Sequence, residues 1–344
     1  MTQLMLDPDA DETREHRQYE SLIRACRAIP PLRTAVVHPC DESSLEAAKA
    51  AAIGKLIEPV LVGPEGRIRE LATRLHFDLT HIELVNTPHS HAAAAQAVAL
   101  ARAGAVSALM KGSLHTDELM AQVVERDTGI RTARRISHVF IMDVPTYPKP
   151  LFITDAAVNL FPTLEDKVDI VQNAIDLAHA LGLPLPKVAI LSAVETITSR
   201  IPSTIDAAAL CKMADRGQIT GAILDGPLAL DNAINHAAAA MKSINSAVAG
   251  DADILLVPTL EAGNMLVKEL TFLANADAAG IVLGARVPII LTSRADSVRA
   301  RLASCAVAAL YTRQIYVEPR IPRQLHAAHA VGVGADSRKT GEMT

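Results

Sequence analysis

The residues of this chain that are best suited to chemistry stand where a predicted strand ends and a helix begins. One such stretch is Thr292-Ser-Arg-Ala-Asp-Ser297, which follows the apolar run 289–291. Two hydroxyl groups, a guanidinium and the free N–H groups of a helix start could together hold a phosphate or a carboxylate. The same stretch could instead be a helix cap made by Ser293 or Asp296, with Arg294 at the surface. The residues alone leave both interpretations open.

Four other predicted strand ends also carry polar side chains. Lys111 and Ser113 follow one strand, although the GxxxxGK[ST] spacing of a phosphate-binding P-loop is absent. The other three ends carry Glu195, Asp225, and Glu261 with Asn264. A surface loop, a turn and a favourable helix dipole would explain these carboxylates without a ligand. Because ligands bind outside the carboxyl ends of parallel strands, the five ends together indicate a cleft for an anionic small molecule.

The elements that would position these residues alternate along the chain. Short β-branched or Leu-rich runs alternate with Ala-rich stretches of helical period, which is typical of βαβ units and a parallel sheet. The predicted strands are 34–37, 60–62, 82–85, 108–110, 139–142, 151–154, 188–191, 221–224, 254–257, 280–283 and 289–291. The predicted helices include 43–56, 91–103, 164–181, 203–216, 230–243, 261–276 and 296–311. We therefore expect an α/β fold.

Composition and charge exclude several classes of protein. The chain has 344 residues, of which 50% are hydrophobic and 21% charged, and its formal net charge is −5. These values are typical of a folded chain, and the length suggests about two domains. Four Tyr, five Phe and no Trp offer few stacking rings, and the balance of charge offers no basic face. We therefore expect no nucleic-acid partner.

No segment indicates export, membrane insertion or metal binding. Residues 1–20 lack the apolar stretch of a secretory signal, and no apolar run reaches the roughly 18 residues of a membrane span. The pair His89-Ser-His91 has no neighbouring Cys or carboxylate and is more typical of a polar loop than of a metal site. Single, scattered cysteines favour buried or idle thiols in a reducing cytoplasm; they are Cys26, Cys40, Cys211 and Cys305.

Nine stretches of this sequence resemble the phosphate acetyltransferase and phosphate butyryltransferase family. They run in family order over about residues 20 to 315, which chance or a shared fold alone explains poorly. The stretches are ALMKG at 108–112, GIRT at 129–132 with ISHV at 136–139, AVET at 193–196, RGQI at 216–219, DGPLALDN at 225–232, ADILLVP at 252–258, EAGN at 261–264 and TSRADS at 292–297. The forms DGPLALDNA and TSRADS look closer to the butyryl branch than to the acetyl branch.

The resemblance implies a two-domain α/β fold like that of isocitrate and isopropylmalate dehydrogenases. Parallel or mixed sheets flanked by helices would enclose an interdomain cleft, and the protein would be a homodimer. Residues 1–145 with 285–330 would form the first domain, and 146–284 the second. The Pro-rich stretch 145–150 would then be a domain crossover. We expect residues 331–344 to be a flexible tail, because regular period is lost there.

The activity implied by the resemblance is reversible transfer of a short acyl group, acetyl to butyryl, between coenzyme A and inorganic phosphate. Coenzyme A would be a substrate, no cofactor or metal would be needed, and no covalent acyl-enzyme would form. Ser293 would stabilise charge on the transferred carbonyl or thiolate, and Arg294 would bind phosphate or the phosphates of coenzyme A. The other expected substrate-binding residues are Lys111, Arg131, Glu195, Asp225, Glu261, Asn264 and Thr292.

This chain departs from the family pattern at the position of the general base. Members of the acetyl branch carry an aspartate about two turns beyond the Ser-Arg pair, whereas residues 298–302 contain no acid. Asp296 is the expected base, and Glu195 is the other candidate.

Two alternatives belong to other classes of protein. A non-catalytic acyl-CoA-sensing or oligomerisation domain would be consistent with a missing base. A metal-dependent NAD dehydrogenase of the related fold would need clustered Asp ligands and a nucleotide site, and no GxGxxG follows a predicted strand. The acyl chain length stays open, since one or two methylenes change binding by only about 1–3 kcal/mol.

Overall fold

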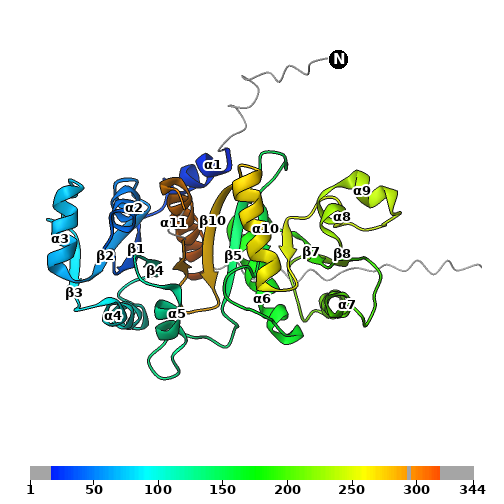
Figure 1. Ribbon diagram of the computed structural model, residues 1–344, viewed down its shortest axis with the longest axis horizontal. Helices are drawn as coiled ribbons and strands as arrows, with labels where there is room; N and C mark the ends of the chain where they lie inside the picture. Colours follow the sequence, from blue (N-terminus) through cyan, green and yellow to red (C-terminus); the bar gives the residue numbers. More distant parts are fainter. Residues whose placement is uncertain (1–16, 293–295, 318–344) are drawn as a thin grey trace, which may run out of the picture.

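The computed structural model describes residues 17–292 and 296–317, and it is built on one sheet of eleven strands (Figure 1). All eleven apolar runs predicted as strands are strands. Their order across the sheet is β3-β2-β1-β4-β11-β10-β5-β6-β9-β7-β8. The strands are β1 (Leu32–Val37), β2 (Ile57–Gly63), β3 (Glu83–Asn86), β4 (Ala108–Lys111), β5 (Ser137–Asp143), β6 (Leu151–Thr154), β7 (Lys187–Leu191), β8 (Ile223–Leu228), β9 (Ile254–Leu256), β10 (Asp277–Leu283) and β11 (Ile289–Ile290).

Strand direction divides the sheet into two halves. Strands β3, β2, β1, β4 and β11 are parallel to one another, as are β6, β9, β7 and β8. Between them, β10 is antiparallel to both β11 and β5, and β5 is antiparallel to β6. The sheet is therefore mixed and not wholly parallel, because β5–β6 and β10–β11 are joined by short loops without the crossover helix that a parallel connection needs. The carboxyl ends of β1 to β4 and β11 reach one edge, and those of β6 to β9 reach the opposite edge.

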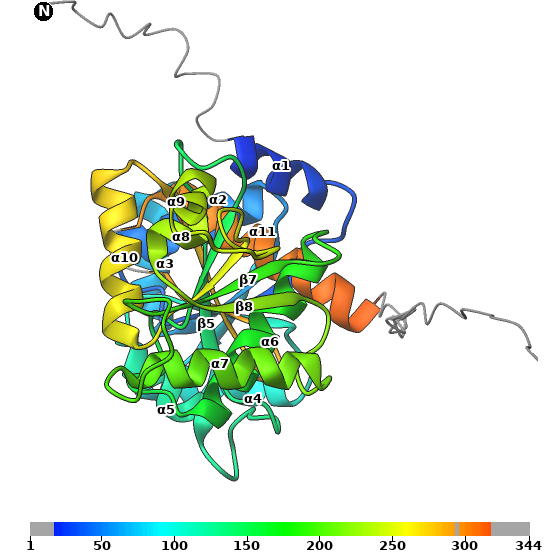
Figure 2. The ribbon, with the colours of Figure 1, turned by 90° about the vertical axis from the view of Figure 1, so that its right-hand side faces the viewer.

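Helices cover both faces of this sheet. They are α1 (Arg17–Cys26), α2 (Glu42–Ile53), α3 (Glu65–Arg74), α4 (Ser90–Arg102), α5 (Thr116–Val124), α6 (Leu164–Ala180), α7 (Pro202–Asp215), α8 (Leu230–Ile234), α9 (His236–Met241), α10 (Leu260–Leu273) and α11 (Val298–Thr312), with a π-helical turn η2 (Arg313–Val317). One apolar cluster joins α2, α3, α6, α7 and α11 to the sheet. Two others lie under α4 with α5 and under α8 to α10. Figure 2 shows α10 and α6 on opposite sides of the strands.

The predicted helix 230–243 is wrong as a single helix. Asn235 ends α8 with an extended backbone, at φ −134° and ψ 113°, and starts α9. Its side-chain oxygen accepts hydrogen bonds from the N–H groups of Ala237 and Ala238, at 2.9 and 3.1 Å. Such capping by Asn competes with helix continuation, so the Ala-rich period did not reveal the break.

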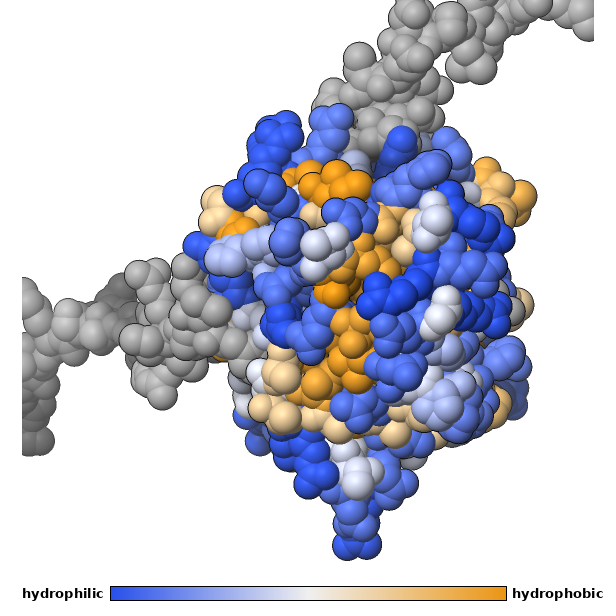
Figure 3. Space-filling model, turned by 90° about the vertical axis from the view of Figure 1, so that its left-hand side faces the viewer, coloured by the Kyte–Doolittle hydropathy of each residue, from blue (hydrophilic) through white to orange (hydrophobic). Residues whose placement is uncertain are grey.

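The β3 end of the sheet is an exposed edge. Leu84 and Val85 of this strand are partly exposed, and an apolar strip crosses the hydrophilic surface on this side of the molecule (Figure 3). The guanidinium of Arg33 pairs with Glu58 and Glu83, and so links β1, β2 and β3 through charged side chains. A short strand flanked by charge is a common protection against pairing with other chains.

The four cysteines are free thiols within the described chain. Burial raises the pKa of Cys26 and Cys40 to about 11 and that of Cys211 and Cys305 to about 12, so these thiols are unreactive at neutral pH. No helix among the described residues is long and apolar enough to cross a membrane. The tail predicted at 331–344 lies outside the described residues.

Candidate active site

The carboxyl ends of β1 and β4 form a switch point in the order of the strands. From β1 the chain moves outward to β2 and β3, then returns to β4 on the other side of β1. Helix α2, which follows β1, and helix α5, which follows β4, therefore leave toward opposite faces of the sheet. Loops that diverge in this way leave a crevice, which is the usual ligand position in α/β sheets.

The loops at this switch point are tied together by short contacts. The N–H groups of Gly112 and Ser113 donate to the carbonyls of Val37 and His38, at 2.9 and 3.0 Å. The Ser113 hydroxyl donates to the His38 carbonyl at 2.8 Å, lies 3.1 Å from His38 Nδ1, and accepts from the Cys40 N–H at 3.2 Å. A Cβ at residue 112 would lie only 2.4 Å from the Val37 oxygen, so glycine is required there. Sequence reasoning missed His38, because its partner lies 75 residues away.

Lys111 and Thr292 are brought together at the same edge. Strand β11 pairs with β4 through Ile289 with Leu109 and Ile290 with Met110, so the chain beyond β11 runs past Lys111. Both side chains are buried, at 8% exposure for Lys111 and 7% for Thr292. Lys111 Nζ lies 3.5 Å from the Gly112 carbonyl oxygen. A buried cation beside a hydroxyl is suited to binding an anion.

The residues that follow Thr292 are described only from position 296. Ser293 and Arg294 lie outside the described residues. Asp296 is half-buried, just ahead of α11. The cap of α11 is Ser297, whose hydroxyl accepts from the Ala300 N–H at 3.1 Å. The interpretation of Ser293 or Asp296 as the cap is therefore wrong.

Five helices begin at this edge of the sheet. Helices α2, α3, α4, α5 and α11 follow β1, β2, β3, β4 and β11, so their N-termini face the carboxyl ends of those strands. Asp41 caps α2 by accepting from the Ser44 N–H at 2.8 Å. Burial and the neighbouring Arg67 lower the pKa of His38, which keeps that ring neutral at neutral pH. Helix N-termini carry partial positive charge, so the edge as a whole favours an anion.

The histidine pair 89–91 has structural roles. The His89 ring caps α4 by accepting from the Ala92 N–H at 3.2 Å. His91 Nδ1 lies 3.2 Å from the Glu118 carboxylate. Among the described residues, no group of three His, Cys, Asp or Glu side chains is arranged to hold a metal ion.

The other predicted site residues lie toward the opposite edge, in the second half of the sheet or beside it. Glu195 accepts from the Asn232 amide and pairs with Lys242 at 2.8 Å, and this hydrogen bond from Lys242 lowers its pKa. Asp225 lies inside β8, beside Ala189 of β7. Asn264 donates to the Ala156 carbonyl at 3.2 Å, and Glu261 is exposed in the first turn of α10. The structure thus divides the five polar strand ends between two edges.

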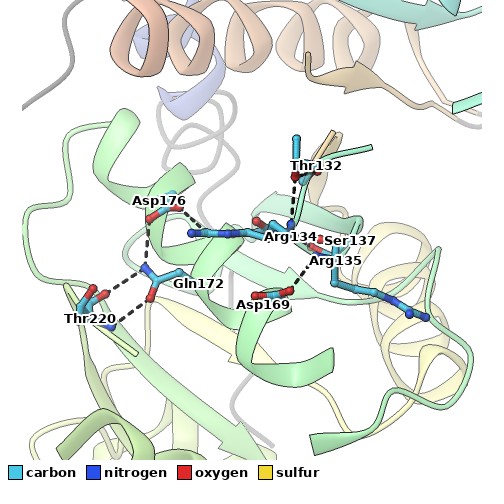
Figure 4. A network of polar contacts seen from close by, with 10 residues as sticks. Thr132, Arg134, Arg135, Ser137, Asp169, Gln172, Asp176 and Thr220 are labelled. Carbon is cyan, nitrogen blue, oxygen red and sulfur yellow. Dashed lines mark hydrogen bonds and ion pairs between the residues drawn. The ribbon is translucent and has the colours of Figure 1, made fainter. Parts of the chain in front are cut away.

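Arg131 lies beside the end of β10, in a loop that a polar network holds in place. It bridges to Ala285, and Thr132 donates from its hydroxyl to the Gly284 carbonyl at 2.6 Å. Figure 4 shows the neighbouring arginines bound to α6: Arg134 pairs with Asp176 at 2.6 Å, and the Arg135 N–H donates to Asp169 at 2.8 Å. The Arg131 side chain is exposed, and no carboxylate in the described part of the chain pairs with it. Its guanidinium is therefore available to an anion.

Comparisons with known proteins identify relatives among the phosphate acyltransferases. Residues 89–309 match the family model described as phosphate acetyl/butaryl transferase. The chain is 67% identical over 294 residues to a phosphate acetyltransferase of Rhizobium meliloti, covering 86% of this chain and 93% of the relative. It is 40% identical over 294 residues to a phosphate butyryltransferase of Clostridium beijerinckii, covering 86% and 97%. The crystal structure of a branched-chain phosphotransacylase from Enterococcus faecalis V583 matches with a TM-score of 0.70 and 29% identity, covering 82% and 99%.

Proposed function

This chain belongs to the phosphate acetyl/butyryl transferase family, and we propose that it transfers a short acyl group between coenzyme A and inorganic phosphate. The reaction is acyl-CoA plus phosphate to acyl phosphate plus CoA, and it is reversible. The single observation that carries this function is the 67% identity to a phosphate acetyltransferase over 86% of the chain. Coenzyme A is a substrate in this reaction, and no cofactor takes part.

Acetyl is the acyl group that the identities favour. The relative named acetyltransferase is 67% identical to this chain, whereas the relative named butyryltransferase is 40% identical. The two motifs that look closer to the butyryl branch point the other way, and they cover only a few residues. We therefore propose acetyl-CoA as the preferred substrate.

The chemistry requires that a phosphate oxygen attacks the thioester carbonyl, that the C–S bond breaks, and that the CoA sulfur leaves as a thiolate. We assign the phosphate to the edge that carries Lys111 and Thr292, where a buried cation and helix N-termini favour an anion. By the family resemblance, Ser293 stabilises the developing negative charge and Arg294 binds the phosphate. These groups lower the barrier by holding both reactants in place and by offsetting charge.

Asp296 is the proposed base for the CoA thiol in the reverse direction. It lies half-buried at the start of the segment that leads into α11, four residues beyond Thr292. Glu195 is disfavoured, because Asn232 and Lys242 hold its carboxylate and its pKa is lowered. A carboxylate that is stabilised in its charged form is a weaker base.

The residues near the opposite edge are assigned to coenzyme A. Phosphate is too small to contact both edges of the sheet, whereas coenzyme A is a long molecule with several polar groups. Arg131 is exposed and unpaired among the described residues, so we assign it to the CoA phosphates. Asp225, Glu261 and Asn264 remain proposed substrate-binding residues on the same grounds of resemblance.

The two-domain division is part of the proposal. Residues 1–145 with 285–330 would form one domain and 146–284 the other, with the cleft arrangement of the isocitrate and isopropylmalate dehydrogenases. Two apolar clusters support this division, since one is drawn almost wholly from the first set of residues and another almost wholly from the second. The third cluster runs through both sets.

A homodimer is also proposed. Several large apolar side chains on or near α10 are exposed, among them Met265 at 64%, Phe272 at 72% and Leu273 at 81%. Figures 1 and 2 show α10 on the outer surface of the molecule. An apolar helix face of this kind is typical of a surface that a second copy covers.

The test is release of CoA from acetyl-, propionyl- and butyryl-CoA, followed with a thiol-reactive chromophore, with and without phosphate. Lys111→Met, Ser293→Ala and Arg294→Ala accompany the parent, and Arg69→Ala on the exposed face of α3 is the matched control. We expect release that depends on phosphate and is fastest with acetyl-CoA. Lys111→Met should lower kcat/KM for phosphate by roughly 10- to 100-fold, since a charged hydrogen bond contributes about 1.5–3 kcal/mol.

The control variant should behave like the parent, and two results would contradict the proposed function. Arg69 pairs with Glu65 on the surface, so Arg69→Ala should stay within about twofold of the parent. Release without phosphate would indicate a hydrolase. Binding of acyl-CoA without any release of thiol would favour the non-catalytic sensing domain.

A further inference from the structure

His138 is a completely buried polar side chain that the proposed function does not use. It lies on β5 with 0% exposure, and neither ring nitrogen has a hydrogen-bond partner of good geometry among the described residues. The Phe140 ring packs against it, with ring centroids 4.2 Å apart. Buried polar groups in folded proteins are nearly always bonded, so a group of this kind requires an explanation.

The polar atom that faces this ring is the carbonyl of Leu291. The antiparallel ladder of β10 with β11 ends at Ile281 and Ile290, and the next rung would join Gly280 to Leu291. The Gly280 N–H donates instead to the Ser304 hydroxyl at 2.9 Å. A Cβ at residue 280 would lie 3.0 Å from both His138 Nε2 and the Leu291 oxygen, so these two atoms converge over the glycine.

We propose that His138 is a positioning residue, which donates from Nε2–H to the Leu291 carbonyl and so sets where Thr292 lies beside Lys111. Strand β11 has only two residues, Ile289 and Ile290, and its ladder bonds alone hold it weakly. A further bond at Leu291 would fix the chain immediately before Thr292. Burial also lowers the pKa of His138 to about 4, which leaves one ring nitrogen protonated at neutral pH.

The kinetic arm of the test rests on the proposed function. It compares the parent with His138→Phe, which keeps a ring without a donor, and with His138→Gln, whose amide reaches the position of Nε2. We expect His138→Phe to lower kcat by about tenfold or more, since small misplacements of substrate-binding groups are costly. His138→Gln should stay within about threefold of the parent. The matched control is Ser137→Ala, which removes a buried hydrogen bond of the same strand to Asn173 at 2.8 Å, and it should leave kcat and KM unchanged.

The second arm does not depend on activity. Hydrogen exchange of the peptides that span 108–115 and 285–292 should become faster in His138→Phe, stay close to the parent in His138→Gln, and be unchanged in Ser137→Ala. If His138→Phe does not fold, His138→Asn replaces it, because the Asn amide reaches only the position of Nδ1 and should be impaired where Gln is not. The proposal would be overturned if His138→Gln and the variant without a suitable donor exchanged equally fast. It would also be overturned if both exchanged at the rate of the parent. If the parent shows no acyl transfer, the proposed function is refuted, and the hydrogen-exchange result alone decides this inference.

Discussion

At the scale of single residues, the proposed phosphate site lies where buried positive charge gathers. Lys111 is only 8% exposed and lies near the starts of α2, α5 and α11, so positive charge and positive helix ends meet in one place. Positive charge gathered in this way favours the binding of an anion. Glu195 is a carboxylate that pairs with Lys242 near the other edge. We therefore propose that the reacting phosphate binds near Lys111.

The neutral state of His138 predicts how stability varies with pH. Burial lowers its pKa from 6.5 to about 4, so between these values the unfolded chain binds a proton that the folded chain does not. The contribution of His138 to the free energy of unfolding is therefore fully present above about pH 6.5 and falls as the pH decreases toward 4, by roughly 3 kcal/mol over the whole range. Urea unfolding of the parent and of His138→Phe across this range would measure the difference. Parallel pH curves for the two proteins would contradict the prediction.

At the scale of elements, the direction of each strand decides which residues can meet. Strands β4 and β11 are parallel neighbours, so Lys111 and Thr292 emerge side by side. Strands β7 and β9 run the other way, because three antiparallel pairings, β11 with β10, β10 with β5 and β5 with β6, separate them from β11. Glu195 and Asn264 follow these reversed strands and therefore emerge at the other edge. By residue type alone, all four of these residues were equal candidates for one binding site. Strand direction places Lys111 and Thr292 at one edge and Glu195 and Asn264 at the other.

The break between α8 and α9 gives a prediction at this scale. Asn235→Ala removes the cap of α9 and should lower the free energy of unfolding by about 0.5–2 kcal/mol. Ala is a strong helix former, but an alanine at 235 cannot join the two helices. Gly250 packs against the His236 backbone, and the Gly250 N–H donates to the Asn232 carbonyl at 2.7 Å, so both sides of the break are held. Urea unfolding measures the change, and acyl transfer should be unaffected. A gain in stability would show that the break is not held by this packing.

At the scale of the whole molecule, one continuous sheet connects both halves. Strands β10 and β5 lie at its centre, and the C-terminal segment returns to place β11 beside β4. The edge with Lys111 therefore depends on residues about 180 positions apart, at 111 and 292. A mixed sheet of this kind keeps the two sets of strand ends apart while a shared apolar cluster packs along both halves.

The proposed homodimer is tested on α10. Phe272 is 72% exposed, and Phe272→Asp would place a charge in the proposed apolar contact. Burying an unpaired carboxylate is costly, so we expect the mass measured by light scattering after gel filtration to fall from that of a dimer to that of a monomer. Ile53→Asp is the matched control, since Ile53 on α2 is 70% exposed and lies outside α10; its mass should equal that of the parent. A parent that is monomeric, or a dimeric Phe272→Asp, would refute this interface.

The sequence by itself determined the strands and the family. All eleven strands were predictable because apolar runs and periodicity depend on near neighbours, and the motifs that carry the resemblance are continuous in the chain. The cap of α11 at Ser297 and the break at Asn235 were not predictable, since several residues in each stretch could cap a helix and packing selects one.

Only the tertiary structure decided which polar strand ends share an edge. The contact of His38 with Ser113 joins residues 75 positions apart, and the convergence of His138 with Leu291 spans three strands. Local propensity cannot encode such pairings, because strand order and direction arise from hydrogen bonds and apolar packing between distant segments. The sequence thus identified the chemical groups, and the directions of β4, β11, β7 and β9 selected the ones that can act together.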